Sequence, residues 1–385
     1  MQKKIKIGFL SAFDIFNDRK SYSGLNYKIR EAIEQAGCEV VWIKFNDVLP
    51  TVKFIKRALF FITRRIQKKD LLISHTRTIG KIIATTVDKK QMEQCDFIFA
   101  SGGTPITVLA ALKYPKPFIY LVDGTFHAMI DFYFHNLAAW NIRSGNYLET
   151  QVYKKPSIII HSSKWASEDA INFYKADSKN CHIIEFGATL DKKDIVETET
   201  HINGETLNVL FSGVEWERKG ADIAVDAVQK LNENGIKARL FLAGIGIENI
   251  PENYRNNKYV EYVGFLDKNV PEQYKQYTEV IKHSHIFLLP TRAECSATVF
   301  CEAASYGLPV FTYDNGGTAD YVINGVNGYR LQMTEVSDHF CQKITDCINN
   351  NELPKLKEGG LKLYRERLNW DVWSQRFKAI IEQAQ

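Results

Sequence analysis

The chain has 385 residues, of which 45% are hydrophobic and 24% are charged. This balance is typical of a globular protein and excludes a disordered chain, and the length favours two domains over one. The formal net charge is +4, but residues 53–69 alone carry seven positive charges and no negative one, so the rest of the chain is slightly acidic. The basic character is therefore local.

The seven cysteines are scattered and show no CxxC spacing. This pattern fits reduced thiols in a cytoplasmic compartment better than a disulfide framework or a zinc site. The N-terminal stretch MQKKIKIGFLSAFD has too short an apolar run for a signal peptide, and no stretch approaches the roughly 20 apolar residues of a membrane span. We therefore expect a cytoplasmic protein that is soluble or attached to a membrane surface.

In the first half of the chain, short runs of β-branched and aromatic residues alternate with helical patterns. Continuous apolar strands separated by helices indicate a parallel sheet covered on both faces. The predicted strands are 4–10, 39–45, 96–100, 117–122 and 157–161, and helical patterns include 24–37 and 163–176.

Residues 188–206 are polar, lack periodicity and are predicted to form a linker. The strand and helix pattern then restarts, which predicts two doubly wound α/β domains in tandem. The expected domains are 1–187 on the acceptor side and 207–370 for nucleotide-sugar binding. A last helix over 371–385 is expected to pack back toward the first domain, after a helix-breaking stretch at 349–360. The predicted strands of the second half are 207–213, 238–244, 259–265, 285–290 and 308–314, with a helix at 220–235.

Ligands of open α/β sheets bind at the carboxyl ends of the strands, so the loops after strands and the cleft between the two domains are the places to look for chemistry. Gly24 precedes a helix and would let backbone N–H groups approach an anion, although a plain turn and cap is the favoured explanation when this loop is taken alone. Arg218 and Lys219 follow a strand and suit a diphosphate, with a solvated basic turn as the alternative.

Two further strand-end loops carry polar groups. The stretch YLVDGTFHAMIDFY places Asp123, Thr125 and His127 directly after a strand. A lone histidine is more often structural than catalytic, but a strand end that faces the cleft favours function. The stretch LAGIGIEN resembles half of a dinucleotide fingerprint, but Asn249 stands where the third glycine belongs, which disfavours NAD binding.

The stretch PTRAECSATVFCEAASYGLP is predicted to form a loop over 291–297 and a helix from Thr298 to Tyr306. Small residues before the helix would leave backbone amides open to a ligand at its positive end. Glu294 in the loop could accept hydrogen bonds from sugar hydroxyls, and Glu302 inside the helix could do the same for a second polyol such as ribose.

The E-x7-E spacing of Glu294 and Glu302, the following EAASYGLPVFTYDNGGTADYVINGVNGYRL and the segment WERKG together resemble the retaining nucleotide-sugar glycosyltransferases of family 4. DGTFHAMIDFY, HSSKWASEDAINFYKAD and EFGATLD match more loosely. The resemblance covers nearly the whole chain except residues 46–95. It implies the GT-B fold, in which two Rossmann-like doubly wound domains face each other across a cleft.

The resemblance also implies roles for the matching residues. Glu302 would bind the donor ribose, Glu294 the donor sugar, and His127 the sugar near the reacting centre. Arg218 and Lys219 would neutralise the departing diphosphate in place of a metal ion, and the chain has no D-x-D triplet to hold one. The rest of the expected donor site comprises Ser296, Ala297, Thr298 and Val299 beside sugar and phosphate, Gly264, Phe265 and Leu266 beside the base, and Gly24 and Asp123.

The implied activity is metal-independent, retaining, hexosyl-type transfer from a nucleoside-diphosphate sugar to a cell-surface glycan or a lipid-linked precursor, with no cofactor. Many relatives have Phe-Gly where this chain has Cys295-Ser296-Ala297, so the donor sugar is left open. Two alternatives remain: a catalytically silent partner that stabilises an active transferase, and a dehydrogenase on the same α/β plan. The presence of Glu294, Glu302, Arg218, Lys219 and His127 together argues against a silent partner. The broken glycine fingerprint argues against a dehydrogenase.

On a helical wheel, residues 53–69 divide into an apolar side and a basic side that also carries Phe60. A basic amphipathic helix suits an anionic membrane surface, which would place the protein on the inner face of the membrane. A helix packed on its own domain with a solvated basic face is an equal alternative. Nucleic-acid binding is disfavoured because the stripe has no interleaved stacking platform.

Overall fold

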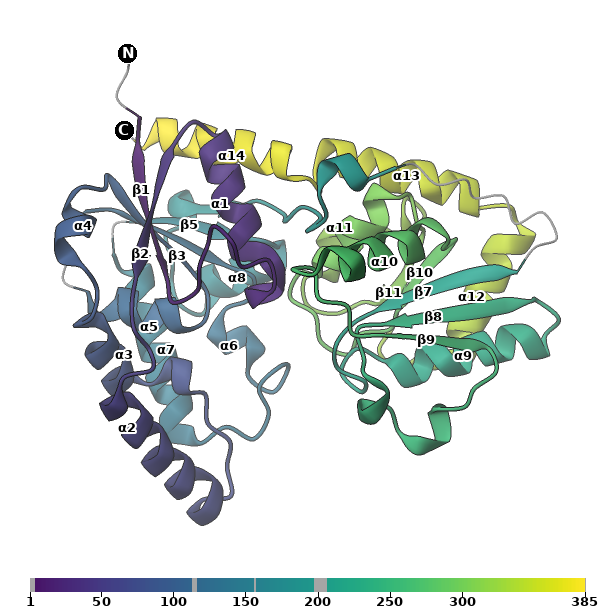
Figure 1. Cartoon of the computed structure of the whole chain (residues 1–385), viewed down its shortest axis with the longest axis horizontal. Coiled ribbons are helices and arrows are strands. Elements are labelled where there is room, and N and C mark those ends of the chain that lie inside the picture. Colours follow the sequence, from purple (N-terminus) through teal and green to yellow (C-terminus); the bar gives the residue numbers. More distant parts are fainter. Residues whose placement is uncertain (1–3, 113–115, 156, 197–205, 385) are drawn as a thin grey trace. The chain divides into compact units, whose positions relative to one another are not determined.

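The computed structural model of the chain describes residues 4–112, 116–155, 157–196 and 206–384 (Figure 1). The chain divides into two compact units, Met1–Ile184 with Ser374–Gln385 and Glu185–Trp373. Each unit contains a six-stranded parallel sheet with helices on both faces. The predicted doubly wound α/β architecture is confirmed. Residues 197–205 of the expected linker lie outside the described residues.

The sheet of the first unit has the strand order β2-β1-β3-β4-β5-β6. Its central strands β3 and β4 are mostly apolar and fully buried, as expected for parallel strands covered on both faces, whereas the edge strand β2 is partly exposed. The carboxyl ends of the strands share one edge of the sheet. The strands are β1 (Lys6–Ser11), β2 (Glu39–Lys44), β3 (Phe97–Ser101), β4 (Phe118–Val122), β5 (Ser157–His161) and β6 (Cys181–Ile183).

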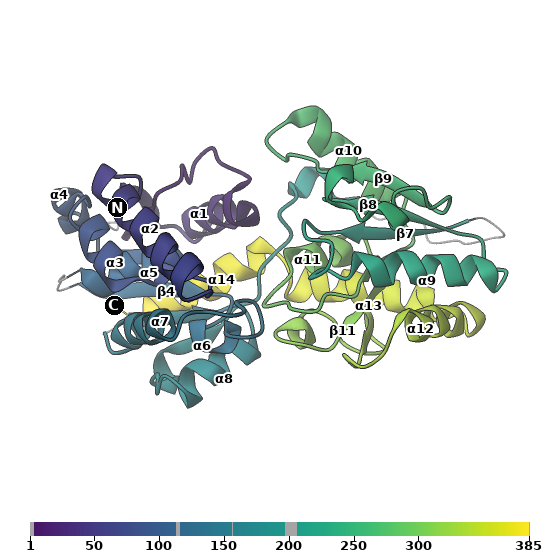
Figure 2. The same cartoon turned by 90° about the horizontal axis from the view of Figure 1, so that it is seen from below.

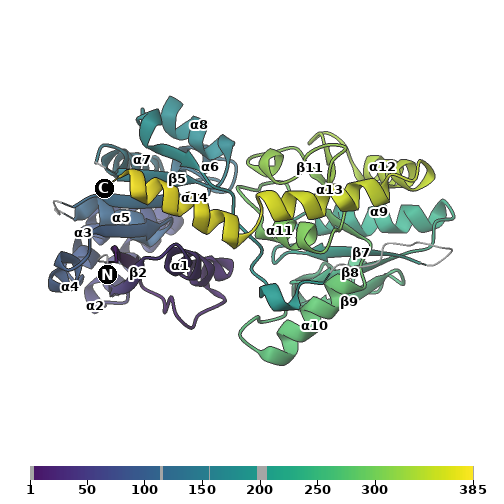
Figure 3. The ribbon, with the colours of Figure 1, turned by 90° about the horizontal axis from the view of Figure 1, so that it is seen from above.

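Helices of the first unit cover both faces of this sheet. Helices α3, α5 and α7 pack on one another, and α1 follows β1, from which the chain turns toward β2. Helix α14 begins at Trp370, and its part from Ser374 onward belongs to this unit (Figure 3). The helices are α1 (Leu25–Gln35), α2 (Pro50–Phe60), α3 (Arg77–Ala84), α4 (Lys89–Glu93), α5 (Thr104–Ala111), α6 (Phe126–Met129), α7 (Ala139–Tyr153), α8 (Lys164–Asn172) and α14 (Trp370–Gln383).

The sheet of the second unit has the order β12-β11-β10-β7-β8-β9, so the strand order reverses between β7 and β10. Ligands of doubly wound sheets bind at such a switch point, outside the carboxyl ends of the strands. This is where the loops with Lys219 and Glu294 begin. The strands are β7 (Leu207–Ser212), β8 (Ala238–Ala243), β9 (Val260–Gly264), β10 (Ile286–Leu289), β11 (Val310–Tyr313) and β12 (Gly328–Leu331).

Helices α9 and α12 pack side by side on one face of this sheet, and α11 and α13 pack together on the other (Figure 2). Amphipathic spacing explains the packing of α9, because its buried alanine, valine and leucine residues recur every three or four positions. The helices are α9 (Ala221–Glu233), α10 (Pro271–Lys282), α11 (Thr298–Ser305), α12 (Ser337–Asn349) and α13 (Leu353–Glu366).

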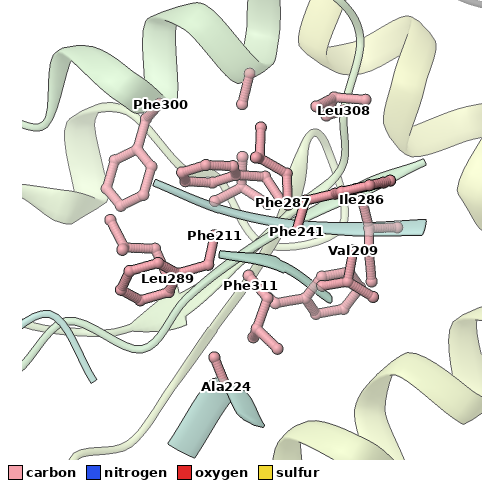
Figure 4. Close-up of a cluster of buried hydrophobic side chains, with 14 of the residues drawn as sticks. Val209, Phe211, Ala224, Phe241, Ile286, Phe287, Leu289, Phe300, Leu308 and Phe311 are labelled. Carbon is pink, nitrogen blue, oxygen red and sulfur yellow. The ribbon is translucent and has the colours of Figure 1, made fainter. Parts of the chain in front are cut away.

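The core of the second unit lies between its sheet and these helices (Figure 4). Phe287 of β10 packs there with Phe300 of α11, with ring centroids 6.1 Å apart, and both are at most 1% exposed. Tight packing at this density fixes α11, and with it Glu302, relative to the strand ends. None of the helices in the described parts of the chain is both long and apolar enough to cross a membrane.

All ten predicted strands are present, whereas the short strands β6 and β12 were not predicted. The predicted helix-breaking stretch 349–360 is confirmed only at its start, where α12 ends at Asn349, and is wrong from Leu353 onward, where α13 begins. Pro354 lies in the first turn of α13, where the missing N–H removes no helical hydrogen bond. Gly359 is explained by a close approach, since a Cβ there would lie 1.9 Å from the carbonyl oxygen of Val326.

The basic segment is helical, and its predicted apolar side packs on the first unit only in part, through Ile55 and Leu59. It comprises α2 and a π-helical stretch over Phe61–Ile66. Val52 and Thr63 are buried, yet the large apolar side chains Phe54, Phe61 and Ile66 are 73%, 62% and 67% exposed. The alternative in which the apolar side packs on its own domain is therefore wrong for these three residues. Helix α2 projects from the body of the first unit (Figure 1).

The approach of the loop after β7 to the end of β10 depends on Gly220, which has a φ of +71°. A Cβ at this position would lie 2.0 Å from the carbonyl oxygen of Pro290. Gly235 also has a positive φ, +85°, but no atom lies within 4 Å of its Cβ position, which makes it a matched control.

We expect Gly235→Ala to lower the free energy of unfolding by about 1–2 kcal/mol, because an L-residue is strained at positive φ. Gly220→Ala should lose about 1–3 kcal/mol more, because the new methyl group must displace backbone. Urea unfolding of both variants measures the difference. Equal losses would show that the contact with Pro290 does not constrain the loop.

Candidate functional site

The loops after β7 and β10 are joined by a buried ion pair. The Nζ atom of Lys219 donates to Oε2 of Glu294, and only 12% and 6% of the two side chains are exposed. Low dielectric strengthens the attraction, while each charge has lost its hydration, so removal of one partner leaves an uncompensated buried charge. Two residues that the sequence assigned to the donor site are thus in direct contact.

Arg218 is held by the same two loops. Its Nη1 atom donates to the carbonyl of Ala293 at 3.2 Å, and its own carbonyl accepts from the amide of Arg292 at 2.7 Å. The guanidinium also donates to the carboxylate of Glu215, and this hydrogen bond lowers the pKa of that carboxyl. The cation is therefore braced at the strand ends by a partner that is itself 56% exposed.

Glu302 in α11 is 1% exposed, and both of its carboxylate oxygens accept hydrogen bonds from the protein. Oε1 accepts from Nζ of Lys268 at 2.6 Å and from the hydroxyl of Thr189, and Oε2 accepts from the hydroxyl of Tyr277 at 2.7 Å. Burial first, and the neighbouring carboxylate second, raise the pKa of Tyr277. These three partners were not found in the sequence. Lys268 lies just after the predicted strand 259–265, and this position at a strand end was the sequence signal that could have identified it.

The chain between the two glutamates forms the start of α11. Ala297 is the N-cap residue with extended backbone, and Thr298 is the first helical residue. The amides of the first helical turn lie at its positive end, and that of Phe300 donates to the carbonyl of Ala297 at 2.9 Å. Cys295, Ser296, Ala297 and Thr298 are buried and Val299 is partly exposed, so the predicted loop and helix are in place.

The residues expected beside the base follow β9. Gly264 ends the strand with a φ of +78°, Phe265 is 48% exposed and Leu266 packs partly against the core. Val214 after β7 and Ile247 after β8 are also exposed, so each of three adjacent strands is followed by an exposed apolar side chain. Val214 and Ile247 were not predicted from the sequence.

His127 lies in the first unit, in the short helix α6 after β4. Its Nδ1 atom is 2.7 Å from Oδ1 of Asp169 in α8, and its ring stacks on Phe173 with centroids 3.5 Å apart. The hydroxyl of Thr125 accepts from the amide of Ala128 as the N-cap of α6 and donates to the carboxylate of Asp169. Of the His127 side chain, 41% is exposed.

Gly24 and Asp123 also belong to the first unit. Gly24 precedes α1 with a φ of +78°, and a Cβ there would lie 2.7 Å from the carbonyl oxygen of Arg19, so the backbone requires glycine. Asp123 is partly buried directly after β4. The structure thus places Gly24, Asp123 and His127 in one unit and the remaining predicted residues in the other.

A buried carboxyl group near His127 was missed in the sequence. Glu149 of α7 accepts from the amide of Phe126 at 2.6 Å and from the hydroxyl of Tyr120 at 3.1 Å. Burial raises the pKa of Glu149 to about 7. The hydroxyl of Tyr174 accepts from the amide of His127 at 3.0 Å. The position of Glu149 on the buried face of a helix was the available signal.

The described residues contain no group of three or more histidine, cysteine, aspartate and glutamate side chains that could hold a metal ion.

Comparison with known protein families gives a match within the second unit. Residues 192–358 match the family described as Glycosyl transferases group 1. The matched residues lie within the second unit, which is therefore similar to this family. The resemblance noted in the sequence is confirmed at this level.

Curated relatives of the chain are distant. An uncharacterized glycosyltransferase of Methanocaldococcus jannaschii is 26% identical over 175 residues, which is 45% of this chain and 47% of that protein. Sucrose synthase of Melioribacter roseus is 26% identical over 132 residues, 33% of this chain and 16% of that protein. The gpi3 subunit of phosphatidylinositol N-acetylglucosaminyltransferase of Schizosaccharomyces pombe is 27% identical over 138 residues, which is 34% of this chain and 29% of that protein. The chain thus spans less than half the length of these relatives.

Solved structures resemble the whole chain. Sucrose-phosphate synthase of Thermosynechococcus elongatus superposes with a TM-score of 0.71 at 15% identity and covers 99% of both chains. Anabaena HepE in complex with UDP-glucose gives 0.63 at 16% identity, covering 99% of this chain and 100% of that one. WaaG, a glycosyltransferase involved in lipopolysaccharide biosynthesis, gives 0.62 at 13% identity, with 97% and 99% covered. At these identities the likeness shows the fold, which is GT-B with two Rossmann-like domains.

The raised pKa of Glu149 predicts a pH dependence of stability. Because the pKa of Glu149 in the folded chain, about 7, lies above the ordinary glutamate value of 4.5, the folded chain keeps a proton that the unfolded chain releases. The resulting stabilisation is full below pH 4.5 and is lost as the pH rises to 7.

Relative to the Glu149→Gln variant, the wild type should therefore lose about 2–4 kcal/mol of unfolding free energy between pH 4.5 and 7. Urea unfolding at successive pH values measures this. Glu168→Gln, an exposed glutamate of α8 that pairs with Lys164, is the control. A difference that stays flat across the range would contradict the buried, proton-holding carboxyl.

Proposed function

We propose that the chain transfers a sugar from a nucleoside-diphosphate sugar to an acceptor. The observation that carries this proposal is the cluster of Arg218, Lys219 and Glu294 at the switch point of the second unit, where the group 1 family matches. Two cations and a carboxylate are fixed there before any ligand arrives. Preorganised charges of this kind stabilise charge that develops during a reaction without further rearrangement.

In the proposed reaction, the bond between the anomeric carbon and the diphosphate oxygen breaks, and the electron pair leaves with the diphosphate. Arg218 and Lys219 take up the growing negative charge, which makes a metal ion unnecessary for this step. The acceptor hydroxyl forms the new bond to the anomeric carbon and passes its proton to the departing diphosphate. Attack on the same face, with retention of configuration and a hexose as the transferred sugar, rests on the resemblance of the E-x7-E motif.

Solved relatives support a nucleotide-sugar donor. Anabaena HepE was solved with UDP, with UDP and glucose, and with UDP-glucose. Curated relatives include sucrose synthases and an N-acetylglucosaminyltransferase subunit, so they differ in the sugar that they handle. We propose that the buried Cys295-Ser296-Ala297 stretch, which replaces Phe-Gly, shapes the sugar pocket and sets the donor. The proposed acceptor is a glycan or a lipid-linked precursor of cell-surface polysaccharide.

A catalytically silent partner protein is the alternative from another class. The charged residues of the site argue against it, because a binding partner has no need for Arg218, Lys219 and both glutamates together. A dehydrogenase is disfavoured because Glu248 and Asn249 lie in a single 3₁₀ turn and not at the start of an α-helix. Release of nucleoside diphosphate from a panel of sugar nucleotides separates the three functions.

Lys219→Ala and Glu302→Ala should each lower turnover by about 10²-fold or more, the scale of losing one partner of transition-state charge. The measurement is nucleoside-diphosphate release with the donor that the panel identifies. Lys230→Ala, a surface lysine of α9 that pairs with Asp338, should keep wild-type turnover. Near-normal rates in both site variants would overturn the site assignment.

We further propose that the basic segment 53–69 attaches the protein to an anionic membrane surface, at the inner face where lipid-linked acceptors are reached. Its charge supports this, because no acidic residue accompanies the seven cations. Its exposed Phe54, Phe61 and Ile66 support it as well, since large apolar side chains beside cations suit the headgroup boundary.

Vesicles of phosphatidylglycerol should co-sediment the protein, and vesicles of phosphatidylcholine should not. Replacing Phe61 and Ile66 together by serine should weaken binding by about 10-fold or more, because two exposed apolar side chains lose their burial in lipid. Ile247→Ser, at an exposed apolar residue of the second unit, should bind as the wild type does. Equal sedimentation with both vesicle types would rule out electrostatic attachment.

A further inference from the structure

The carboxylate of Asp169 contacts His127, which the resemblance to family 4 places near the donor sugar if the chain is a transferase as proposed. We propose that Asp169 is a positioning residue for the transfer, which fixes His127 as a hydrogen-bond acceptor at Nε2. The inference rests on the proposed function for the role of His127. Asp169 would determine which ring nitrogen of His127 can accept a hydrogen bond and which direction the ring faces.

The chemistry of the pair sets the tautomer. An ionised carboxylate only accepts hydrogen bonds, so the 2.7 Å contact between Nδ1 of His127 and Oδ1 of Asp169 requires a proton on Nδ1. In the neutral ring the lone pair is then on Nε2. Such a ring accepts a hydrogen bond from a hydroxyl, whereas the opposite tautomer would donate one. A sugar hydroxyl is a matching donor for the exposed part of the ring.

The ring has little freedom around this contact. Phe173 covers one ring face at a 9° interplanar angle, and the backbone amide of His127 donates to the hydroxyl of Tyr174. Asp169 is itself fixed, because its second oxygen accepts from the hydroxyl of Thr125 and only 17% of its side chain is exposed. Weak solvent screening at that burial keeps the contact between carboxylate and imidazole strong.

Helical spacing delivers both neighbours of the ring together. Asp169 lies in α8, and Phe173 follows four positions later at its C-cap, so the two side chains lie on one face of the helix. Glu168, one position earlier, lies elsewhere on the helix, pairs with Lys164 at 3.5 Å and is 58% exposed. A carboxylate at position 169 reaches His127, while its neighbour at 168 does not. Glu168→Gln is therefore a matched control for the loss of a carboxylate from α8.

A merely structural role is the competing explanation, because Asp169 also braces Thr125, the N-cap of α6. The two roles can be separated. Thr125→Val removes the hydroxyl contact and leaves the pair with His127, whereas Asp169→Asn changes both. If bracing is all that matters, the two variants should behave alike.

The tautomer can be read without any substrate. The full chain with ¹⁵N-labelled histidine is studied by two-bond ¹H–¹⁵N correlation at pH 8, where an ordinary imidazole is neutral, and His127→Gln assigns the signal. The wild type and Glu168→Gln should show the proton on Nδ1, and Asp169→Asn should move it toward Nε2. Asp169→Glu, which keeps a carboxylate, should restore the wild-type signal. A wild-type proton on Nε2, or an unchanged signal in Asp169→Asn, would overturn the proposal.

Kinetics with the sugar nucleotide identified by the panel give the second readout. Asp169→Asn should lower kcat by about 10- to 100-fold, the scale of a hydrogen bond to a charged group, with the donor KM changed by less than about threefold. Adding His127→Ala to Asp169→Asn should lower kcat no further, because both substitutions remove the same function. An equally slow Thr125→Val variant would assign Asp169 to bracing alone and overturn the proposal.

The two readouts separate the inference from the function on which it rests. A chain that releases no nucleoside diphosphate from any sugar nucleotide contradicts the proposed function, while the tautomer measurement still tests the pair. Conversely, full activity of His127→Ala would overturn the catalytic relevance of the pair and leave the transferase proposal standing on Arg218, Lys219 and Glu302. A variant that fails to fold is recognised by the loss of its dispersed histidine signals, and Asp169→Glu then carries the comparison.

Discussion

The ion pair between Lys219 and Glu294 is the constraint on which the site of the second unit depends. It connects the loop after β7 with the loop after β10, on either side of the point where the strand order reverses. Gly220 allows the backbones to meet, and the contacts of Arg218 with Ala293 and Arg292 complete the connection. Loops are usually the most variable parts of a fold, but these two are held by charge, backbone hydrogen bonds and close packing at once.

A site built in this way carries its positive charge in a neutralised form. Lys219 faces Glu294 and Arg218 faces Glu215, so each cation already has a counter-charge. The two partners differ in exposure, because Glu294 is buried and Glu215 is largely open to solvent. Under the proposed function, an arriving diphosphate would therefore separate Arg218 from Glu215 more easily than Lys219 from Glu294.

Much of the fold and part of the candidate site could be predicted from the sequence, because the sequence signals for them are local. Apolar runs marked the ten strands, and the E-x7-E spacing placed Glu294 and Glu302 around the start of α11. The partners of Glu302 could not be found in this way, since Thr189 lies 113 residues away in the chain and only the fold brings it near. Asp169 was equally hidden, as its partner His127 lies 42 residues away.

The environment of Glu302 bears on how a nucleotide would be held and released. Both carboxylate oxygens are already served by Lys268, Thr189 and Tyr277, so a ribose that reached them would exchange one set of hydrogen bonds for another. Exchange of this kind adds little net free energy. Retention of the nucleotide would then depend on the phosphates and the base, and the spent nucleoside diphosphate could depart while Glu302 returns to its own partners. Under the proposed function, Glu302 would thus select the shape of the ligand more than it would add to binding affinity.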